Sequence, residues 1–189
     1  RETSCVVARD IGDRKRRERR RQVLERLREE VWRMQTGREI EKLIDLARTS
    51  LRSLGVTFDH FGLNLMDVRT RDHFRVYEQT TANRAVMPQG GADQILLQFW
   101  TGGEPVYRAD LEQEDPYDEC ETIQTNYGMR IRAVLDVPFS HGIVAVNSLR
   151  PHAFSDEDIA LVSELATALS DAFRRTDDLA CLAAQREHL

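Results

Sequence analysis

The sequence predicts an α+β fold in which helices pack on the faces of an antiparallel β-sheet. Short apolar runs follow one another through the middle of the chain, and polar turns separate them, which is typical of antiparallel strands. Amphipathic helical patterns stand on both sides of these runs. The length of 189 residues suits one domain with an appendage.

Two helices are expected before the first strand. The first runs from Gln22 to Gln35, and Gly37 follows it as a break that we interpret as a hinge. The second ends at Gly55, a typical C-terminal cap. Apolar residues recur at spacings of three and four along both helices: Leu24, Leu27, Val31 and Met34 in the first, and Ile40, Leu43, Ala47, Leu51 and Leu54 in the second.

Five strands and two short helices are expected in the middle of the chain. The strands cover residues 58–68, 74–78, 105–109, 131–139 and 143–149. A polar turn at 69–72 makes the first two strands a hairpin, and a loop at 88–91 follows them. The short helices cover residues 95–100 and 120–127, and glycines end both of them.

A long helix closes the chain. Ser155 is its predicted N-cap, and three acidic residues in the first turn, Asp156, Glu157 and Asp158, suit the helix dipole. Its buried stripe is expected at Ile159, Val162, Leu165, Ala166, Leu169, Ala172 and Phe173, with an extension through Leu179, Leu182 and Ala183.

Charge is distributed unevenly along the chain. The net charge of −5 combines residues 1–38, where 13 basic and 7 acidic side chains give +6, with residues 39–189, where the balance is −11. The basic run Arg14–Arg21 is typical of a surface for nucleic acid or anionic lipid. Because it leads directly into an amphipathic helix, and no recognition fold or aromatic platform accompanies it, we interpret it as a solvated helix face and do not expect nucleic-acid binding.

Several classes of protein are excluded by what the sequence lacks. It has no apolar window of membrane-spanning length and no apolar start, so we expect a cytoplasmic protein without a membrane span. Cys5, Cys120 and Cys181 are far apart and form no CxxC pair, which favours reduced thiols over a disulfide framework. The histidines have no metal-ligand spacing, and no catalytic triad order, Walker loop or GxGxxG occurs. We expect neither a metal site nor enzymatic activity.

The first residues resemble the exit of a PAS domain. Cys5-Val6-Val7-Ala8 reads as a β-strand, and Asp10-Ile11-Gly12 followed by Asp13-Arg14-Lys15 is similar to the family's Asp-Ile-Thr triplet and outgoing helix, with Gly12 in place of Thr. The resemblance implies that residues 1–13 are the last strand of an upstream PAS domain. Residues 14–37 would then be a basic linker or signalling helix.

The remainder resembles a GAF domain over roughly residues 38–175. The resemblance is carried by Gly103-Glu104-Pro105-Val106, by Tyr127-Gly128-Met129-Arg130 leading into Ala133–Pro138, and by Gly142–Asn147 followed by Phe154–Asp158. It implies a six-stranded antiparallel sheet and a ligand cavity under the inserted loops and short helices. It also implies terminal helices that form a dimeric bundle with a second subunit, with residues 176–189 as an outgoing helix toward an output domain.

Three ligand classes known in this family were compared with the residues present. For cyclic nucleotides, Asn147, Phe154 and Asp158 match the motif, but Ser148 replaces a Lys and Ile159 replaces a Glu, so the motif is broken. For a covalent bilin, Cys120 stands at the attachment position, with Glu121 in place of the usual His. Reduction of free methionine sulfoxide needs two thiols within reach, and only Cys120 lies in the sheet region.

The sequence therefore predicts a non-catalytic sensory or regulatory module that signals through dimeric helices. The alternatives are a bilin photoreceptor attached through Cys120 and a ligand-free dimerisation relay. The identity of a cofactor stays open. A ligand pocket with aromatic walls, two guanidinium groups and a carboxylate is expected to be lined by Phe99, Trp100, Tyr107, Arg108, Asp110, Tyr117, Cys120, Tyr127 and Arg132.

Overall fold

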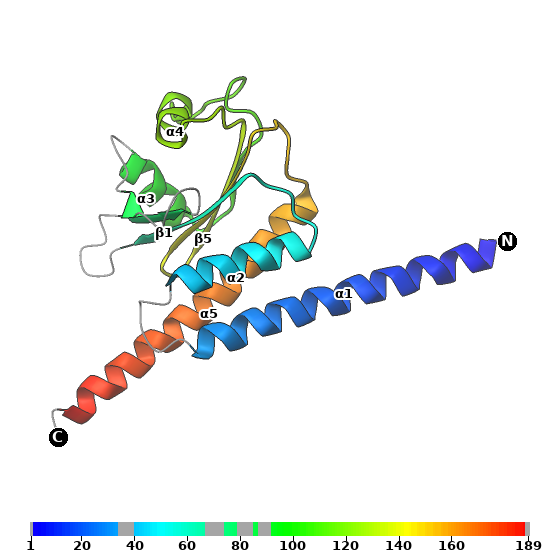
Figure 1. Ribbon diagram of the computed structural model, residues 1–189, viewed down its shortest axis with the longest axis horizontal. Helices are drawn as coiled ribbons and strands as arrows, with labels where there is room; N and C mark the ends of the chain where they lie inside the picture. The colour runs from blue at the N-terminus through cyan, green and yellow to red at the C-terminus, as the bar shows by residue number, and fades with distance from the viewer. Residues whose placement is uncertain (1, 34–39, 67–73, 79–84, 87–91, 188–189) are drawn as a thin grey trace.

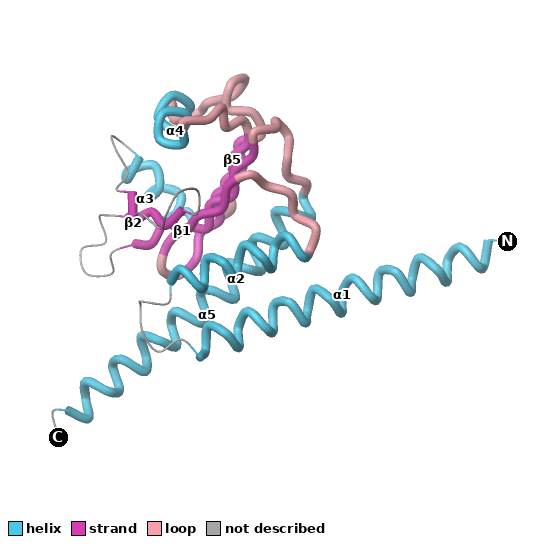
Figure 2. Tube along the Cα trace, viewed as in Figure 1, coloured by secondary structure: helices cyan, strands magenta, loops and turns pink. Residues whose placement is uncertain are grey.

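A computed structural model shows one β-sheet with helices on both faces (Figures 1 and 2). It describes all residues except 1, 34–39, 67–73, 79–84, 87–91 and 188–189. The helices are α1 (Glu2–Arg33), α2 (Ile40–Ser53), α3 (Ala92–Gly102), α4 (Cys120–Tyr127) and α5 (Asp156–Glu187). The strands are β1 (His60–Met66), β2 (Phe74–Glu78), β3 (Ala85–Val86), β4 (Val106–Arg108), β5 (Ala133–Phe139) and β6 (Gly142–Ser148).

Within the described residues the six strands form a single sheet in the order β3-β2-β1-β6-β5-β4, and neighbouring strands are antiparallel. This confirms the predicted α+β class. The predicted strand at 74–78 and the predicted helix at 120–127 have the bounds observed for β2 and α4. The two-residue strand β3 was not predicted. The predicted turn at 69–72, the loop at 88–91 and the hinge at Gly37 lie outside the described residues.

The strand predicted at Cys5–Ala8 is wrong, because α1 begins at Glu2 and includes these residues. The first helix also starts well before the predicted Gln22. A strand needs a neighbouring strand to pair its backbone, whereas a helix forms its hydrogen bonds within the segment. Arg and Glu, which are good helix formers, dominate the residues that follow. The helical pattern therefore extends backward through the segment that resembled a PAS strand.

Helices α1, α2 and α5 form a layer on one face of the sheet (Figure 1). Helices α1 and α5 run parallel, because two contacts between them occur in the same order along both helices. Arg20 forms a bidentate ion pair with Glu164, and further toward the C-terminus of each helix the Arg175 guanidinium lies 4.3 Å from the Trp32 ring centroid. Leu24 and Leu27 of the predicted seam are buried within the chain. Coverage of this part of the seam therefore does not require a second subunit. The N-terminal part of α1 and the C-terminal part of α5 extend away from the sheet in opposite directions (Figure 1).

One continuous apolar cluster joins this helical layer to the sheet. Strand register places Phe61, Val146, Leu135 and Tyr107 in one row across four strands. Side chains from α2 and α5, including the fully buried Leu51, Leu165 and Leu169, belong to the same cluster. Because side chains alternate along a strand, the intervening residues point to the other face, toward α3 and α4.

Candidate functional site

The sheet face toward α3 and α4 carries four polar side chains, which we call the polar face: His60 and Asn64 from β1, Asp136 from β5 and Asn147 from β6. All four are buried, with exposed fractions of 3–7%. His60 pairs directly with Asn147 across β1 and β6. Their chain neighbours Phe61 and Val146 face the helical layer, so His60 and Asn147 point together toward α3 and α4.

Two small residues lie in the middle of the polar face. Gly62 pairs with Ala145, and Ala145 pairs with Asp136, so these three form the row beside His60 and Asn147. The apolar side chains on this face belong to two separate clusters. One surrounds Phe74 and Phe99 near α3, and the other consists of Leu111, Ile131 and Val134 with partly buried residues of α4 packed against them.

Two buried polar atoms of the polar face have no hydrogen-bond partner among the described residues. They are His60 Nδ1 and Asn147 Oδ1, which belong to directly paired residues. Leaving such an atom unpaired in a protein interior destabilises the fold by about 1–3 kcal/mol. Buried polar atoms normally have a partner in the protein, in ordered water or in another bound group, which makes this pair a candidate position for a bound group.

His60 is held by residues at the end of α4. Its Nε2 lies 3.1 Å from the Met129 sulfur, and its ring meets the Tyr127 ring edge to face, with centroids 5.1 Å apart. Burial lowers the pKa of His60 below its usual value, despite the opposing charge of Asp59. The imidazole is therefore neutral at neutral pH.

Arg108 connects the polar face to α4 through a buried ionic network. Its Nε donates to Glu119 at 2.6 Å and its Nη2 donates to Asp136 at 2.6 Å, while Nη1 donates to the Val106 carbonyl at 2.8 Å. Burial raises the pKa of Glu119, against the opposing effect of Arg108. Glu119 directly precedes α4, so this network connects the start of the helix to Asp136 of the polar face.

A second ion-pair network lies beside the α4 cluster. Arg132 donates to both carboxylate oxygens of Asp110, at 2.7 and 2.6 Å, and Arg130 forms a bidentate pair with Glu112. The hydrogen bond from Arg132 lowers the pKa of Asp110, and the one from Arg130 lowers the pKa of Glu112. Asp110 and Arg132 are thus partners of each other.

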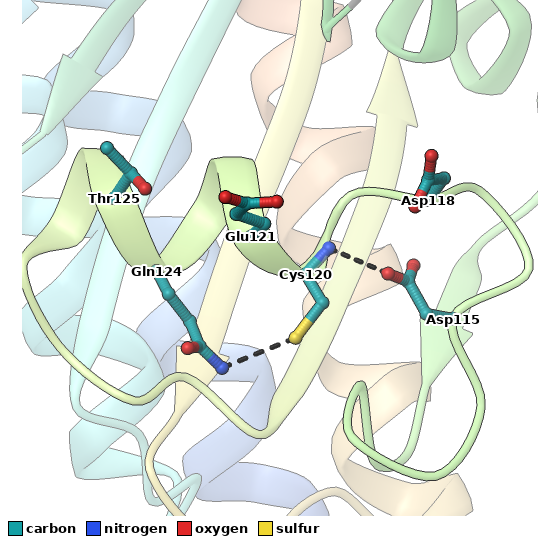
Figure 3. Close-up of a pocket in the computed structure, with 6 residues that line it drawn as sticks. All are labelled: Asp115, Asp118, Cys120, Glu121, Gln124 and Thr125. Atoms are coloured by element: carbon teal, nitrogen blue, oxygen red, sulfur yellow. Dashed lines mark hydrogen bonds between the residues drawn. The ribbon is translucent and has the colours of Figure 1, made fainter.

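Cys120 begins α4 and borders an open pocket of about 470 Å³ (Figure 3). The Asp115 carboxylate accepts hydrogen bonds from the backbone N–H groups of Glu119 and Cys120, and the Gln124 amide donates to the Cys120 sulfur at 3.3 Å. Burial, followed by the negative charge of Asp115, raises the pKa of the thiol. A nucleophilic thiolate is disfavoured in these surroundings.

The structure divides the nine pocket residues predicted from sequence into three groups. Phe99, Trp100, Arg108 and Tyr117 lie together near α3: the Phe99 and Tyr117 rings meet edge to face, and Arg108 Cζ is 5.0 Å from the Phe99 centroid. Asp110, Cys120, Tyr127 and Arg132 lie near α4. Tyr107 lies on the opposite face, where its ring packs on Phe154 and its hydroxyl accepts a hydrogen bond from the Phe154 backbone.

The polar face itself was missing from the predicted pocket. The signal was present in β1, where His60, Gly62 and Asn64 alternate with Phe61, Leu63 and Leu65, because a period of two places the polar members on one face. Asp136 and Asn147 continue the pattern in β5 and β6. Glu119 could not be found in this way, because it lies in a loop before α4.

This architecture is the GAF fold. The GAF domain of a phosphoenolpyruvate-protein phosphotransferase from Coxiella burnetii matches with a TM-score of 0.64 at 16% identity, over 87% of this chain and 98% of that chain. Free methionine-R-sulfoxide reductase from Neisseria meningitidis matches with a TM-score of 0.60 at 19% identity, over 85% of this chain and 91% of that chain. The chromophore-binding domain of bacteriophytochrome RpBphP3 from R. palustris matches with a TM-score of 0.59 at 10% identity, over 84% of this chain and 61% of that chain.

At these identities the likeness defines the fold alone. No protein-family model and no curated protein sequence matches the chain. Within the described residues, none of the helices combines the length and the apolar character that crossing a membrane requires.

Proposed function

We propose that the chain is a non-catalytic sensory or regulatory GAF module that couples the polar face to the packing of α1 and α5. The observation that carries this proposal is the pair of buried, unpartnered atoms on His60 and Asn147. Such atoms are unfavourable for stability unless a water or another molecule supplies the missing partner, and we propose that a ligand does so here.

The sheet provides the connection between the two layers. Residues of the polar face alternate in β5 and β6 with side chains of the cluster under α5, so a shift of these strands on binding would change the packing of α5. Helix α1 packs along α5. Parallel helices have discrete alternative packings, and we propose that the signal enters along α1 from an upstream domain and leaves along α5 toward an output domain, in a homodimer.

The absence of catalysis is proposed from the state of Cys120. Thiol-dependent reduction needs a thiolate as nucleophile, and the surroundings of Cys120 raise its pKa. The chain shares its fold with a free methionine-R-sulfoxide reductase, so turnover of methionine sulfoxide by this chain would contradict the proposal.

A covalent bilin at Cys120 is a second candidate, because this thiol is free, half-buried and borders an open pocket. The candidate is tested by expressing the chain with a bilin supply and recording zinc-dependent fluorescence on a denaturing gel. Fluorescence that Cys120→Ala abolishes supports it. Absence of fluorescence on the unaltered chain excludes it.

The main proposal is tested by a small-molecule screen for compounds that raise the unfolding temperature, combined with light scattering. We expect at least one stabilising compound, whose effect is lost in an Asn147→Leu variant, and a dimeric mass. A dimer that no compound stabilises would favour the ligand-free relay. A monomer would contradict signalling through dimeric helices.

A further inference from the structure

We propose that the polar face recognises a small molecule with a cationic group that donates N–H hydrogen bonds, such as an amidine or a guanidine, and that it rejects anions. This inference rests on the proposed function, because it names the ligand class of the same site. It follows from the donors and acceptors, the charge and the shape of the face.

The two unpartnered atoms are both hydrogen-bond acceptors. Asn147 Oδ1 is an amide oxygen. The thioether sulfur of Met129 has no hydrogen to donate, so its contact with His60 Nε2 is a hydrogen bond only when Nε2 carries the proton. His60 Nδ1 then has a free lone pair, and both acceptors require a ligand that donates.

The buried charges of the site favour a cation. One guanidinium, Arg108, is held between two acidic side chains, Glu119 and Asp136, so this network contains one more acidic group than basic groups. A carboxylate has about four acceptor positions, and Arg108 occupies one of those on Asp136. Asp136 therefore has capacity to accept a hydrogen bond from a ligand.

Both arginines predicted to bind a ligand already have carboxylate partners. Arg108 binds Glu119 and Asp136, and Arg132 binds Asp110 through two hydrogen bonds. Among the described residues that line this face, neither guanidinium is available to neutralise a phosphate or a carboxylate. An anion placed here would meet the two unpartnered acceptors and a network with more acidic than basic groups.

The placement of the acceptors suits a flat donor group. His60 and Asn147 are direct cross-strand neighbours, with β-carbons about 5 Å apart, and Asp136 is diagonal to Asn147 at about 7 Å. Gly62 and Ala145 carry almost no side chain between them. Phe99 and Tyr117 belong to the apolar cluster beside Arg108, which in turn binds Asp136. An aromatic ring attached to the donor group would therefore have apolar side chains nearby.

The test compares benzamidine, benzamide and benzoate, which have nearly the same shape and carry charges of about +1, 0 and −1. Each compound is titrated into the full chain, and binding is followed by NMR shifts of polar-face resonances. A hydrogen bond to a charged group contributes about 1.5–3 kcal/mol, so we expect benzamidine to bind at least about tenfold more tightly than benzamide and benzoate to bind most weakly.

Substitutions at the polar face test whether the preference for a cationic compound arises there. Asp136→Asn should weaken benzamidine binding by about tenfold or more, and Asn147→Asp should strengthen it. The matched control is Asp171→Asn, which makes the same change on the exposed surface of α5 and should leave binding unchanged.

Three results would overturn the inference. If benzamide or benzoate shifts the polar-face resonances at lower concentration than benzamidine, the ligand class is wrong while the proposed function stands. If benzamidine binding is the same in Asp136→Asn as in the unaltered chain, the cation does not bind at this face. If none of the three compounds shifts these resonances, the inference fails, and the wider compound screen decides the proposed function separately.

Discussion

The two faces of the sheet bury very different side chains. Toward α2 and α5, residues such as Leu51, Leu135 and Leu165 form one continuous apolar cluster, which is the arrangement that stabilises a fold most. Toward α3 and α4, a buried ionic network and two unpartnered atoms separate two smaller clusters. The first face accounts for folding, whereas the second retains groups that oppose stability, as binding sites do.

The largest expected effect comes from breaking the ionic network of the polar face. Arg108→Met leaves two carboxylates buried without their cation, and we expect the free energy of unfolding to fall by about 4 kcal/mol, measured by urea denaturation. Arg130→Met is the matched control, because its side chain is 71% exposed and solvent screens its ion pair with Glu112, so this substitution should change stability far less.

A triple variant sharpens this prediction. Changing Arg108→Met together with Glu119→Gln and Asp136→Asn removes the buried charges as well, and it should recover part of the lost stability. An Arg108→Met variant that loses no more than the Arg130→Met control would contradict the network's role.

Truncating a side chain in the apolar cluster between the sheet and the helical layer should have the next largest effect on stability. Leu165 is fully buried in the continuous cluster, so Leu165→Ala should lower the free energy of unfolding by about 3 kcal/mol. The same substitution at Leu149, which is 43% exposed, should lower it by less than about 1 kcal/mol. Equal losses at the two positions would show that the cluster under α5 is not the main source of stability.

Replacing an unpartnered polar group should have a smaller effect, of opposite sign. Asn147→Leu removes a buried acceptor without a partner, and we expect the free energy of unfolding to stay the same or to rise by up to about 1 kcal/mol. The exposed Asn126 of α4 serves as control, with a change within about 0.5 kcal/mol for Asn126→Leu. A loss above about 2 kcal/mol in Asn147→Leu would mean that the amide stabilises the fold.

The smallest effect concerns the pH dependence of stability. The pKa of His60 is lower in the folded chain than its usual value of 6.5, so the unfolded chain binds this proton first. The stability contributed by His60 is complete above pH 6.5 and declines as the pH falls toward the native pKa. Between pH 7 and pH 5, His60→Phe should lose less stability than the unaltered chain.

His152, which is exposed, provides the control for this comparison. His152→Gln should keep the steeper decline of the unaltered chain. Identical pH profiles for His60→Phe and the unaltered chain would show that His60 is not buried in its neutral form.

Much of the fold could be predicted from local patterns. Alternation of apolar and polar residues located β2, and apolar runs on either side of a turn located β5 and β6. Gly128 correctly marked the end of α4, where it adopts φ 62°. Residues 5–8 could not be assigned in this way, because Val-rich segments of this length suit a strand or a helix, and the continuous helical segment decided between them.

The site was less predictable because it depends on which face a residue occupies and on which charges pair. Tyr107 and Arg108 are adjacent in sequence but point to opposite faces of the sheet. Arg108 pairs with Asp136, which is 28 residues away in the sequence, and Arg132 pairs with Asp110, which is 22 residues away. No local signal distinguishes an arginine held by such a partner from one available to a ligand.

Coupling between the polar face and the long helices is tested most directly by hydrogen–deuterium exchange on the whole chain, with and without the compound that raises the unfolding temperature most. We expect slower exchange in β1 and α4, which border the polar face, together with altered exchange in α1 and α5. Slower exchange at the polar face with unchanged exchange in both long helices would contradict the coupling on which the proposed sensory role depends.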